Sequence, residues 1–186
     1  MAHNIGEEIA GTYLRVIKNC EFIEYNLYTE DVQGEIDVIG VNSLEKKVYI
    51  CEVAVHLITG LQYTKNNTPN NTNKLIEKFK RDIAYANKRF DQYEKVFMFW
   101  SPIVKNQKAK SKHNQLESIN KVKDSLKNNL GVNLIFIINE DFEKCLKELR
   151  EYVINRTEEI KSPILRFMQI EEKLKKFLIK NKKYES

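Results

Sequence analysis

Two apolar stretches that carry acidic residues set the architecture of this chain: GEIDVIG at Gly34–Gly40 and VYICEVAVH at Val48–His56. Both are rich in Val and Ile, which favour β-strands, and a short polar turn separates them, as in a hairpin. Asp is disfavoured inside a strand, so Asp37 needs a specific role. Strand alternation in the second stretch places Glu52 and Ala54 on one face together with His56.

Asp37 and Glu52 are the acidic residues in the interior of these two strands. On adjacent strands, their carboxyl groups can approach within a few ångströms. Two carboxylates that close repel each other unless a cation neutralises them, and hard oxygen ligands of this kind select Mg²⁺ or Mn²⁺. The pattern therefore predicts a divalent metal site. The alternative is that both residues form ordinary salt bridges in an unrelated α/β domain.

Outward from these strands, apolar periodicity predicts an alternation of helices and strands. Three consecutive strands favour a meander, and a helical crossover then returns to the same sheet. The expected fold is α/β, with a mixed five-stranded sheet flanked by helices and followed by C-terminal helices. We expect one domain over residues 1–186, with a core at about 5–140 and a helical extension at about 141–183. The predicted helices are Ile5–Lys18, Lys74–Phe90, Leu116–Asn129, Asp141–Asn155 and Pro163–Lys180, and the predicted strands are Cys20–Thr29, Gly34–Asn42, Lys47–Leu57, Lys95–Val104 and Val132–Asn139.

Composition favours a cytoplasmic globular protein. The chain has 42% hydrophobic and 31% charged residues, an ordinary composition for a soluble domain. It has neither an apolar run of the roughly 18 residues that a membrane span requires nor a basic and apolar leader. Its three cysteines are widely spaced and do not form a metal-binding motif, which suits a reducing compartment. Thr64–Asn73 contains no apolar residue, so we expect an exposed loop there.

The net charge of +5 conceals an asymmetry. Residues 1–60 carry four Lys or Arg against ten Asp or Glu, whereas the remaining 126 residues carry 27 against 16. An acidic segment on a basic body suits a metal centre beside a phosphate-binding surface, and so favours DNA as a partner. Solvated lysine-rich faces are the alternative. Candidate phosphate contacts are the lysines of one loop, Lys105, Lys108, Lys110 and Lys112.

The acidic strands resemble a known family. Gly34-Glu35-Ile36-Asp37, followed by Cys51-Glu52-Val53-Ala54, resembles the PD-(D/E)XK nuclease superfamily, in which an Asp and a Glu-x-Lys on adjacent strands form the active site. Gly6-Glu7-Glu8-Ile9 resembles the first helix of small bacterial members related to Holliday-junction resolvases, and Asn26 also matches their pattern. The resemblance covers about residues 5–57. It implies a restriction-endonuclease-like αβββαβ core, a Mg²⁺ or Mn²⁺ ion held by Asp37, Glu52 and the Val53 carbonyl, and Glu7 as an accessory ligand.

The chain departs from this family at one position. Ala54 stands where the family has its catalytic lysine, and a methyl group can neither orient water nor stabilise phosphate charge. Family members are known to relocate this lysine to the following helix. There the helical periodicity places Lys78 beside the apolar stripe, on the same edge as Asp82, whereas Arg81 is expected to point outward. His56 is a second replacement, as a general base or phosphate ligand, or else a strand-end histidine without a catalytic role.

The sequence thus favours a metal-dependent endonuclease that hydrolyses a phosphodiester bond in DNA, with catalytic residues Asp37, Glu52, Lys78, His56 and Glu7. Small nucleases of this kind often form homodimers to cut two strands. Because Ala54 replaces the lysine, a catalytically inactive nuclease fold that binds nucleic acid or a protein partner is the alternative. A third reading is an interaction domain without nucleic-acid contact.

Overall fold

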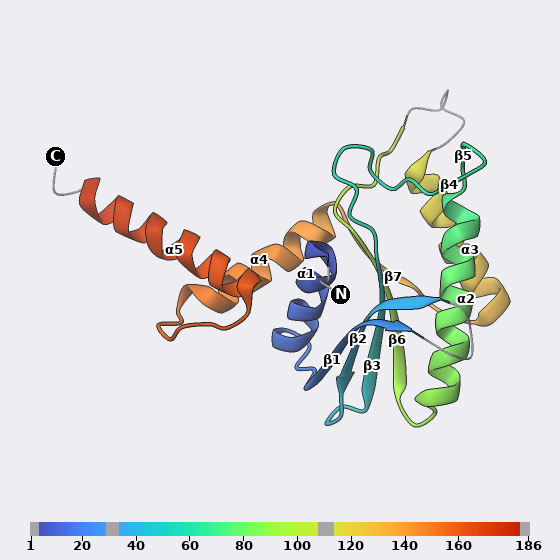
Figure 1. Ribbon diagram of the computed structural model, residues 1–186, viewed down its shortest axis with the longest axis horizontal. Coiled ribbons are helices and arrows are strands. Elements are labelled where there is room, and N and C mark those ends of the chain that lie inside the picture. Colours follow the sequence, from blue (N-terminus) through green and yellow to red (C-terminus); the bar gives the residue numbers. More distant parts are fainter. Residues whose placement is uncertain (1–3, 29–33, 108–113, 183–186) are drawn as a thin grey trace.

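The centre of the molecule is a mixed sheet of five strands in the order β1-β2-β3-β6-β7 (Figure 1). The computed structural model describes residues 4–28, 34–107 and 114–182. Adjacent strands pair antiparallel from β1 to β3 and parallel from β3 to β7. The expected α/β fold with a mixed five-stranded sheet is confirmed. The strands of this sheet are β1 (Phe22–Tyr28), β2 (Glu35–Asn42), β3 (Lys47–Val53), β6 (Glu94–Ser101) and β7 (Ile135–Ile138).

Helices cover both faces of the sheet. Figure 1 shows α1 (Ile5–Val16) and α4 (Glu140–Ile154) on one side, and α2 (Asn71–Arg89) and α3 (Gln115–Leu130) on the other. Each side has its own buried apolar cluster. Phe79 of α2 packs with Ile50 and Phe99 on one face, whereas Leu14 of α1 packs with Cys51 and Trp100 on the opposite face. Alternate residues of the central strands therefore serve two cores, as the pleat requires.

The start of α1 is fixed by local chemistry. The Asn4 side chain accepts hydrogen bonds from the backbone N–H groups of Gly6 and Glu7, and the Glu7 carboxylate accepts from the Asn4 backbone. This reciprocal capping box satisfies N–H groups that the first turn leaves unpaired. At Gly11 a side chain has no room, because a Cβ atom there would lie 2.2 Å from the Tyr25 hydroxyl oxygen of β1. Asn4 thus fixes where the helix begins, and Gly11 allows the helix to lie close to β1.

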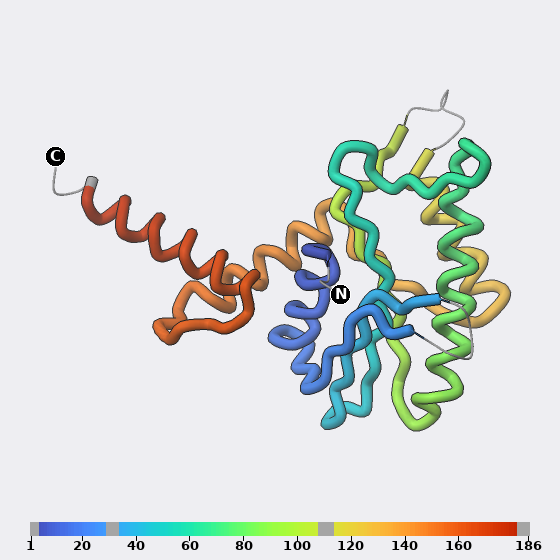
Figure 2. Tube along the Cα trace, viewed as in Figure 1, coloured from blue at the N-terminus to red at the C-terminus, as the bar shows by residue number. Residues whose placement is uncertain are grey.

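The last helix, α5 (Pro163–Lys182), begins against the domain and then extends away from it (Figure 2). Leu165 and Met168 in its first turns are buried. Several large apolar side chains further along are more than half exposed: Phe167, Ile170, Leu174, Phe177, Leu178 and Ile179. Within the described ranges, none of the helices has the length and apolar character needed to cross a membrane.

Most expected helices and strands agree with the structure to within three residues at each end, and two segments near the site differ further. The third strand ends at Val53 rather than Leu57, because its parallel partner β6 ends at Ser101 and the next residue, Pro102, has no N–H to donate. Thr64–Asn73 is not simply an exposed loop. It forms a small ribbon, β4 (Thr64–Lys65) with β5 (Thr68–Pro69), and then the start of α2. Asn71 is buried there because it accepts from the Tyr63 N–H at 2.7 Å and donates to the Leu61 carbonyl at 3.1 Å.

Candidate metal centre

The strand register aligns three polar residues in one row across the sheet. Tyr25 and Leu27 pair with Val38 and Ile36, so Asn26 lies between these pairs, opposite Asp37, where the ladder is interrupted because Asn26 has φ of +51°. Val38 pairs with Cys51, and one further step of the same antiparallel register places Asp37 opposite Glu52. The row therefore runs from Asn26 through Asp37 to Glu52, on adjacent strands β1, β2 and β3.

Lys78 of α2 joins the two carboxyl groups. Its Nζ atom contacts Oε2 of Glu52 and lies 3.5 Å from Oδ2 of Asp37. The site is shielded from water: the side chains of Lys78, Asp37 and Glu52 are 18%, 11% and 0% exposed. The carboxyl groups of positions 37 and 52 therefore converge on one cation, and that cation is the ammonium group of the chain itself.

The orientation of Asp37 is fixed by the neighbouring strand. Its Oδ2 atom accepts a hydrogen bond of 2.6 Å from the Val53 backbone N–H. This bond uses an N–H at the end of β3 and directs the carboxylate toward Lys78. A carboxylate that accepts from a fixed backbone donor loses little rotamer freedom when it binds a cation.

Arg81 corrects the sequence-based expectation that it points outward. Its side chain is only 12% exposed, and its Nη2 atom lies 2.8 Å from Oε1 of Glu52. The same guanidinium contacts Oδ1 of the buried Asp82 and donates to the Glu35 backbone carbonyl. A helical wheel places only the Cβ atom, and the long aliphatic arm of Arg81 turns back to the sheet from there.

Burial and charge govern protonation in this cluster. Burial, followed by the neighbouring Asp37 charge, raises the pKa of Glu52 well above its ordinary value, although Lys78 opposes this shift. Burial also raises the pKa of Asp82, and a hydrogen bond with Glu52, followed by the charge of Arg81, opposes that shift. Burial lowers the pKa of Lys78, but the charges of Glu52 and Asp37 outweigh it, so the net shift is upward and Lys78 is a cation at neutral pH.

Glu7 lies at the edge of this cluster. Its two carboxylate oxygens serve the capping box with Asn4, and Asn26 also hydrogen bonds to it. Burial raises its pKa, and the negative charges of Asp37 and Glu35 add to the shift. Glu7 is thus close enough to Asp37 for the two negative charges to interact. It also has a structural role, because it caps the N-terminus of α1.

The chemistry of the site has to follow from these side chains. No family model, no curated protein and no solved structure matches the chain. Function is therefore inferred from the groups that the site contains. These are the row of Asn26, Asp37 and Glu52, the ammonium group of Lys78 and the guanidinium group of Arg81.

A divalent cation fits the donor set but competes with Lys78. Carboxylate oxygens of Asp37 and Glu52 are the hard ligands that Mg²⁺ and Mn²⁺ prefer. Oδ2 of Asp82 is buried nearby without a hydrogen-bond partner among the described residues. In the described part of the chain, no three His, Cys, Asp or Glu side chains are arranged to hold a metal. The two carboxylates thus match a divalent cation in ligand type, and the ammonium group of Lys78 occupies the position between them.

Ala54, at the position of the family's lysine, and His56, the second candidate replacement, differ in their surroundings. Ala54 is buried in the apolar cluster beneath α2, and its backbone N–H donates to the Trp100 carbonyl at 2.8 Å. Because β3 ends at Val53, strand alternation does not extend to His56, and its proximity to Glu52 stays a prediction. The His56 side chain is exposed, and its ring lies 6.4 Å from that of Tyr63.

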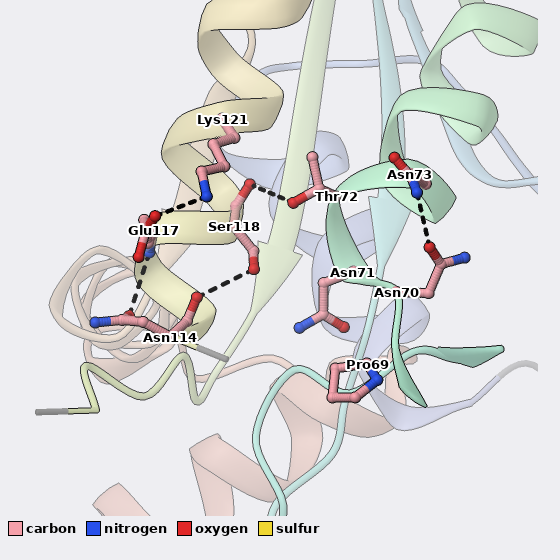
Figure 3. A pocket seen from close by; sticks show the side chains of 9 residues that line it. All are labelled: Pro69, Asn70, Asn71, Thr72, Asn73, Asn114, Glu117, Ser118 and Lys121. Carbon is pink, nitrogen blue, oxygen red and sulfur yellow. Dashed lines mark hydrogen bonds and ion pairs between the residues drawn. The ribbon is translucent and has the colours of Figure 1, made fainter. Parts of the chain in front are cut away.

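Two pockets lie near the N-terminal ends of α2 and α3, and their linings do not include Asp37, Glu52 or Lys78. One, of about 210 Å³, is lined by Asn70 and Asn71 of α2 and by Glu117, Ser118 and Lys121 of α3 (Figure 3). Figure 3 shows Lys121 turned toward Glu117, its ion-pair partner at 2.7 Å, so this cation is already neutralised.

The second pocket, of about 420 Å³, includes Lys105, whose Nζ donates to the Ile58 carbonyl at 2.7 Å. Of the expected phosphate contacts, Lys105 is thus held beside the loop that follows β3. Lys108, Lys110 and Lys112 lie outside the described residues.

Sequence reasoning missed two members of the site, Arg81 and Tyr63. Tyr63 is close enough for the charges of Glu52 and Asp37 to raise its pKa further, although burial is the main cause of the upward shift. The only signal for Arg81 was its place next to Asp82 on the helix that carries Lys78. Tyr63 precedes the polar Thr64–Asn73 segment and gave no signal of its own.

Proposed function

We propose that this protein is a metal-dependent endonuclease that hydrolyses phosphodiester bonds in DNA, with its active site at Asp37 and Glu52. The proposal depends mainly on one observation: two carboxyl groups from adjacent strands converge on a single ammonium group in a site largely shielded from water. A carboxylate pair on neighbouring strands beside a lysine is the arrangement that the resemblance to PD-(D/E)XK nucleases implies. The mixed sheet with the element order αβββαβ is also what that resemblance implies.

Asp37 and Glu52 would hold the cation, with Mg²⁺ or Mn²⁺ as the expected ion. When bound, the ion supplies a Lewis acid that polarises the scissile phosphate and lowers the pKa of a water molecule. Glu7, which hydrogen bonds with Asn4 and Asn26 and feels the charge of Asp37, would support the ion as an accessory ligand through water.

Lys78 takes the part of the lysine that Ala54 replaces. It comes from α2 rather than from β3, yet its ammonium group reaches the same two carboxylates. If a cation took the place of its ammonium group, the positive charge of Lys78 would remain beside the site and would stabilise developing negative charge on a phosphate. In the metal-free site, burial lowers the pKa of Lys78, but the charges of Glu52 and Asp37 outweigh this effect and raise the pKa, so Lys78 is a cation there.

Cleavage of plasmid and branched DNA in the presence of Mn²⁺ tests this proposal. We expect cleavage by the unmodified chain and a rate at least about a hundredfold lower for Glu52→Gln, which removes one ligand charge without changing shape. Glu45→Gln is the matched control, because Glu45 is an exposed residue at the far end of the same hairpin. Cleavage that persists in Glu52→Gln contradicts the assignment.

A second candidate has its own support. Glu52 is neutralised by Lys78 and Arg81 without any metal, and Ala54 is part of an apolar core. These contacts also suit a nuclease fold that binds nucleic acid without cutting it. That candidate predicts DNA binding that weakens with salt, persists in EDTA and is accompanied by no cleavage.

A further inference from the structure

The two carboxylate oxygens of Glu52 have different partners, Arg81 and Lys78. Its Nη2 atom donates to Oε1 of Glu52 at 2.8 Å, while Oε2 of Glu52 faces Lys78. Glu52 is completely buried, so an unheld carboxylate there would have no water to orient it. The arginine thus fixes the plane of the carboxylate and leaves one oxygen for the cation position.

Arg81 is itself held from two further sides. Its Nε atom donates to Oδ1 of Asp82 at 2.9 Å, and its Nη2 atom donates to the Glu35 carbonyl at 2.5 Å. Asp82 is completely buried and belongs to the same helix, whereas Glu35 begins β2. The guanidinium therefore connects α2, β2 and β3, and its planar fork is suited to such divided contacts.

The backbone at Gly34 makes room for this guanidinium. A Cβ atom on residue 34 would lie 2.1 Å from Nη1 of Arg81, and φ there is +148°, which favours glycine. Glycine at position 34, immediately before the strand that carries Asp37, thus leaves space for the side chain of Arg81.

We propose that Arg81 is a positioning residue that holds Glu52 in the orientation required to bind the catalytic cation. This inference rests on the proposed function and adds a residue that neither the strand pattern nor the family resemblance indicates. Partners that orient a metal ligand typically change metal affinity about tenfold to a hundredfold when removed.

The direction in which cation affinity changes when Arg81 is removed distinguishes a positioning role from simple charge repulsion. Removing a positive charge beside a cation site strengthens cation binding if Coulomb repulsion alone matters. The positioning role predicts the opposite, weaker binding after loss of Arg81, because Oε1 of Glu52 loses its anchor and the carboxylate turns away.

The test is a calorimetric titration of the full chain with Mn²⁺. Arg81→Met is expected to weaken Mn²⁺ binding by about tenfold or more. Arg81→Lys keeps the positive charge, but an ammonium group lacks the planar fork that contacts two carboxylates together. The Mn²⁺ affinity of this variant is therefore expected to lie between those of Arg81→Met and the unmodified chain. Lys80→Met, on the exposed side of the same helix, removes the same charge away from the site and is expected to bind as the unmodified chain does.

Binding by a folded Arg81→Met variant that equals or exceeds that of the unmodified chain overturns the positioning role. Circular dichroism and cooperative unfolding establish that the variant is folded. If Arg81→Met does not fold, Arg81→Lys decides: affinity at least about threefold weaker supports the role, and equal affinity overturns it.

Glu52→Gln separates the two proposals. If it abolishes Mn²⁺ binding while Arg81→Met does not weaken it, only the role of Arg81 fails. If Glu52→Gln binds Mn²⁺ as well as the unmodified chain, the metal site itself is wrong, and the positioning role falls with it.

Discussion

Replacing Lys78 with Met removes the cation between Asp37 and Glu52 while keeping much of its aliphatic volume. The side chain is 18% exposed and Glu52 is 0% exposed, so the change leaves a buried carboxylate with Arg81 as its remaining cationic partner. Removal of one partner of a buried ion pair costs about 3–5 kcal/mol, and the contact with Arg81 reduces this to about 2–3 kcal/mol. For a chain of this size, that loss lowers Tm by roughly 4–12 °C.

Added Mn²⁺ is expected to compensate for the lost ammonium group. A ligand at a hundred times its Kd stabilises the folded state by about 2.7 kcal/mol, close to the loss calculated for Lys78→Met. The assay is thermal unfolding by calorimetry, with and without Mn²⁺, on the unmodified chain, Lys78→Met and the control Lys80→Met. The gain from Mn²⁺ is expected to be larger in Lys78→Met than in the unmodified chain, because no ammonium group has to be displaced.

Two results would refute this reasoning. In the first, Lys78→Met unfolds at the same temperature as Lys80→Met, which means that the buried ion pairs contribute nothing. In the second, Mn²⁺ stabilises Lys78→Met no more than the unmodified chain, which means that the space between the two carboxylates does not accept a divalent ion.

Three further predictions concern packing and protonation. Leu149→Ala, in a fully buried position of α4, is expected to lower the free energy of unfolding by about 2–5 kcal/mol, whereas Phe177→Ser, 58% exposed on α5, is expected to change it by less than about 0.5 kcal/mol; urea unfolding measures both. Gly11→Ala is expected to lower the free energy of unfolding by about 1–3 kcal/mol in the same assay, because a Cβ atom there meets the Tyr25 ring, and an unchanged midpoint would count against this contact. Stability is expected to fall as pH rises from about 9 toward 11, because burial raises the pKa of Cys145 to about 11, so the unfolded chain loses thiol protons first; unfolding free energies that stay flat over this range would contradict it.

The sequence was most informative where a residue violated the pattern around it. Asp37 and Glu52 are acids inside apolar strands, and this conflict alone indicated a site, which the strand register then brings together. The family resemblance implies a lysine relocated to the helix after β3, and the helical period there indicates Lys78, which the structure places beside Glu52.

Features set by the partner strand or by long side chains were not predictable. The residues after Val53 read as a continuing strand, but the length of β3 depends on β6, which ends before Pro102. The helical period predicts that Arg81 points outward, but its long, flexible side chain reaches Glu52. Asn71 looked like a loop residue, yet two local hydrogen bonds allow it to be buried.

A crystal structure of the unmodified chain soaked in Mn²⁺ tests the metal site most directly. We expect anomalous density between the carboxylates of Asp37 and Glu52, at roughly 2–2.5 Å from an oxygen of each, with the ammonium group of Lys78 moved aside. Lys78 still bridging the two carboxylates at saturating Mn²⁺, with no anomalous density beside them, would contradict a metal-dependent nuclease.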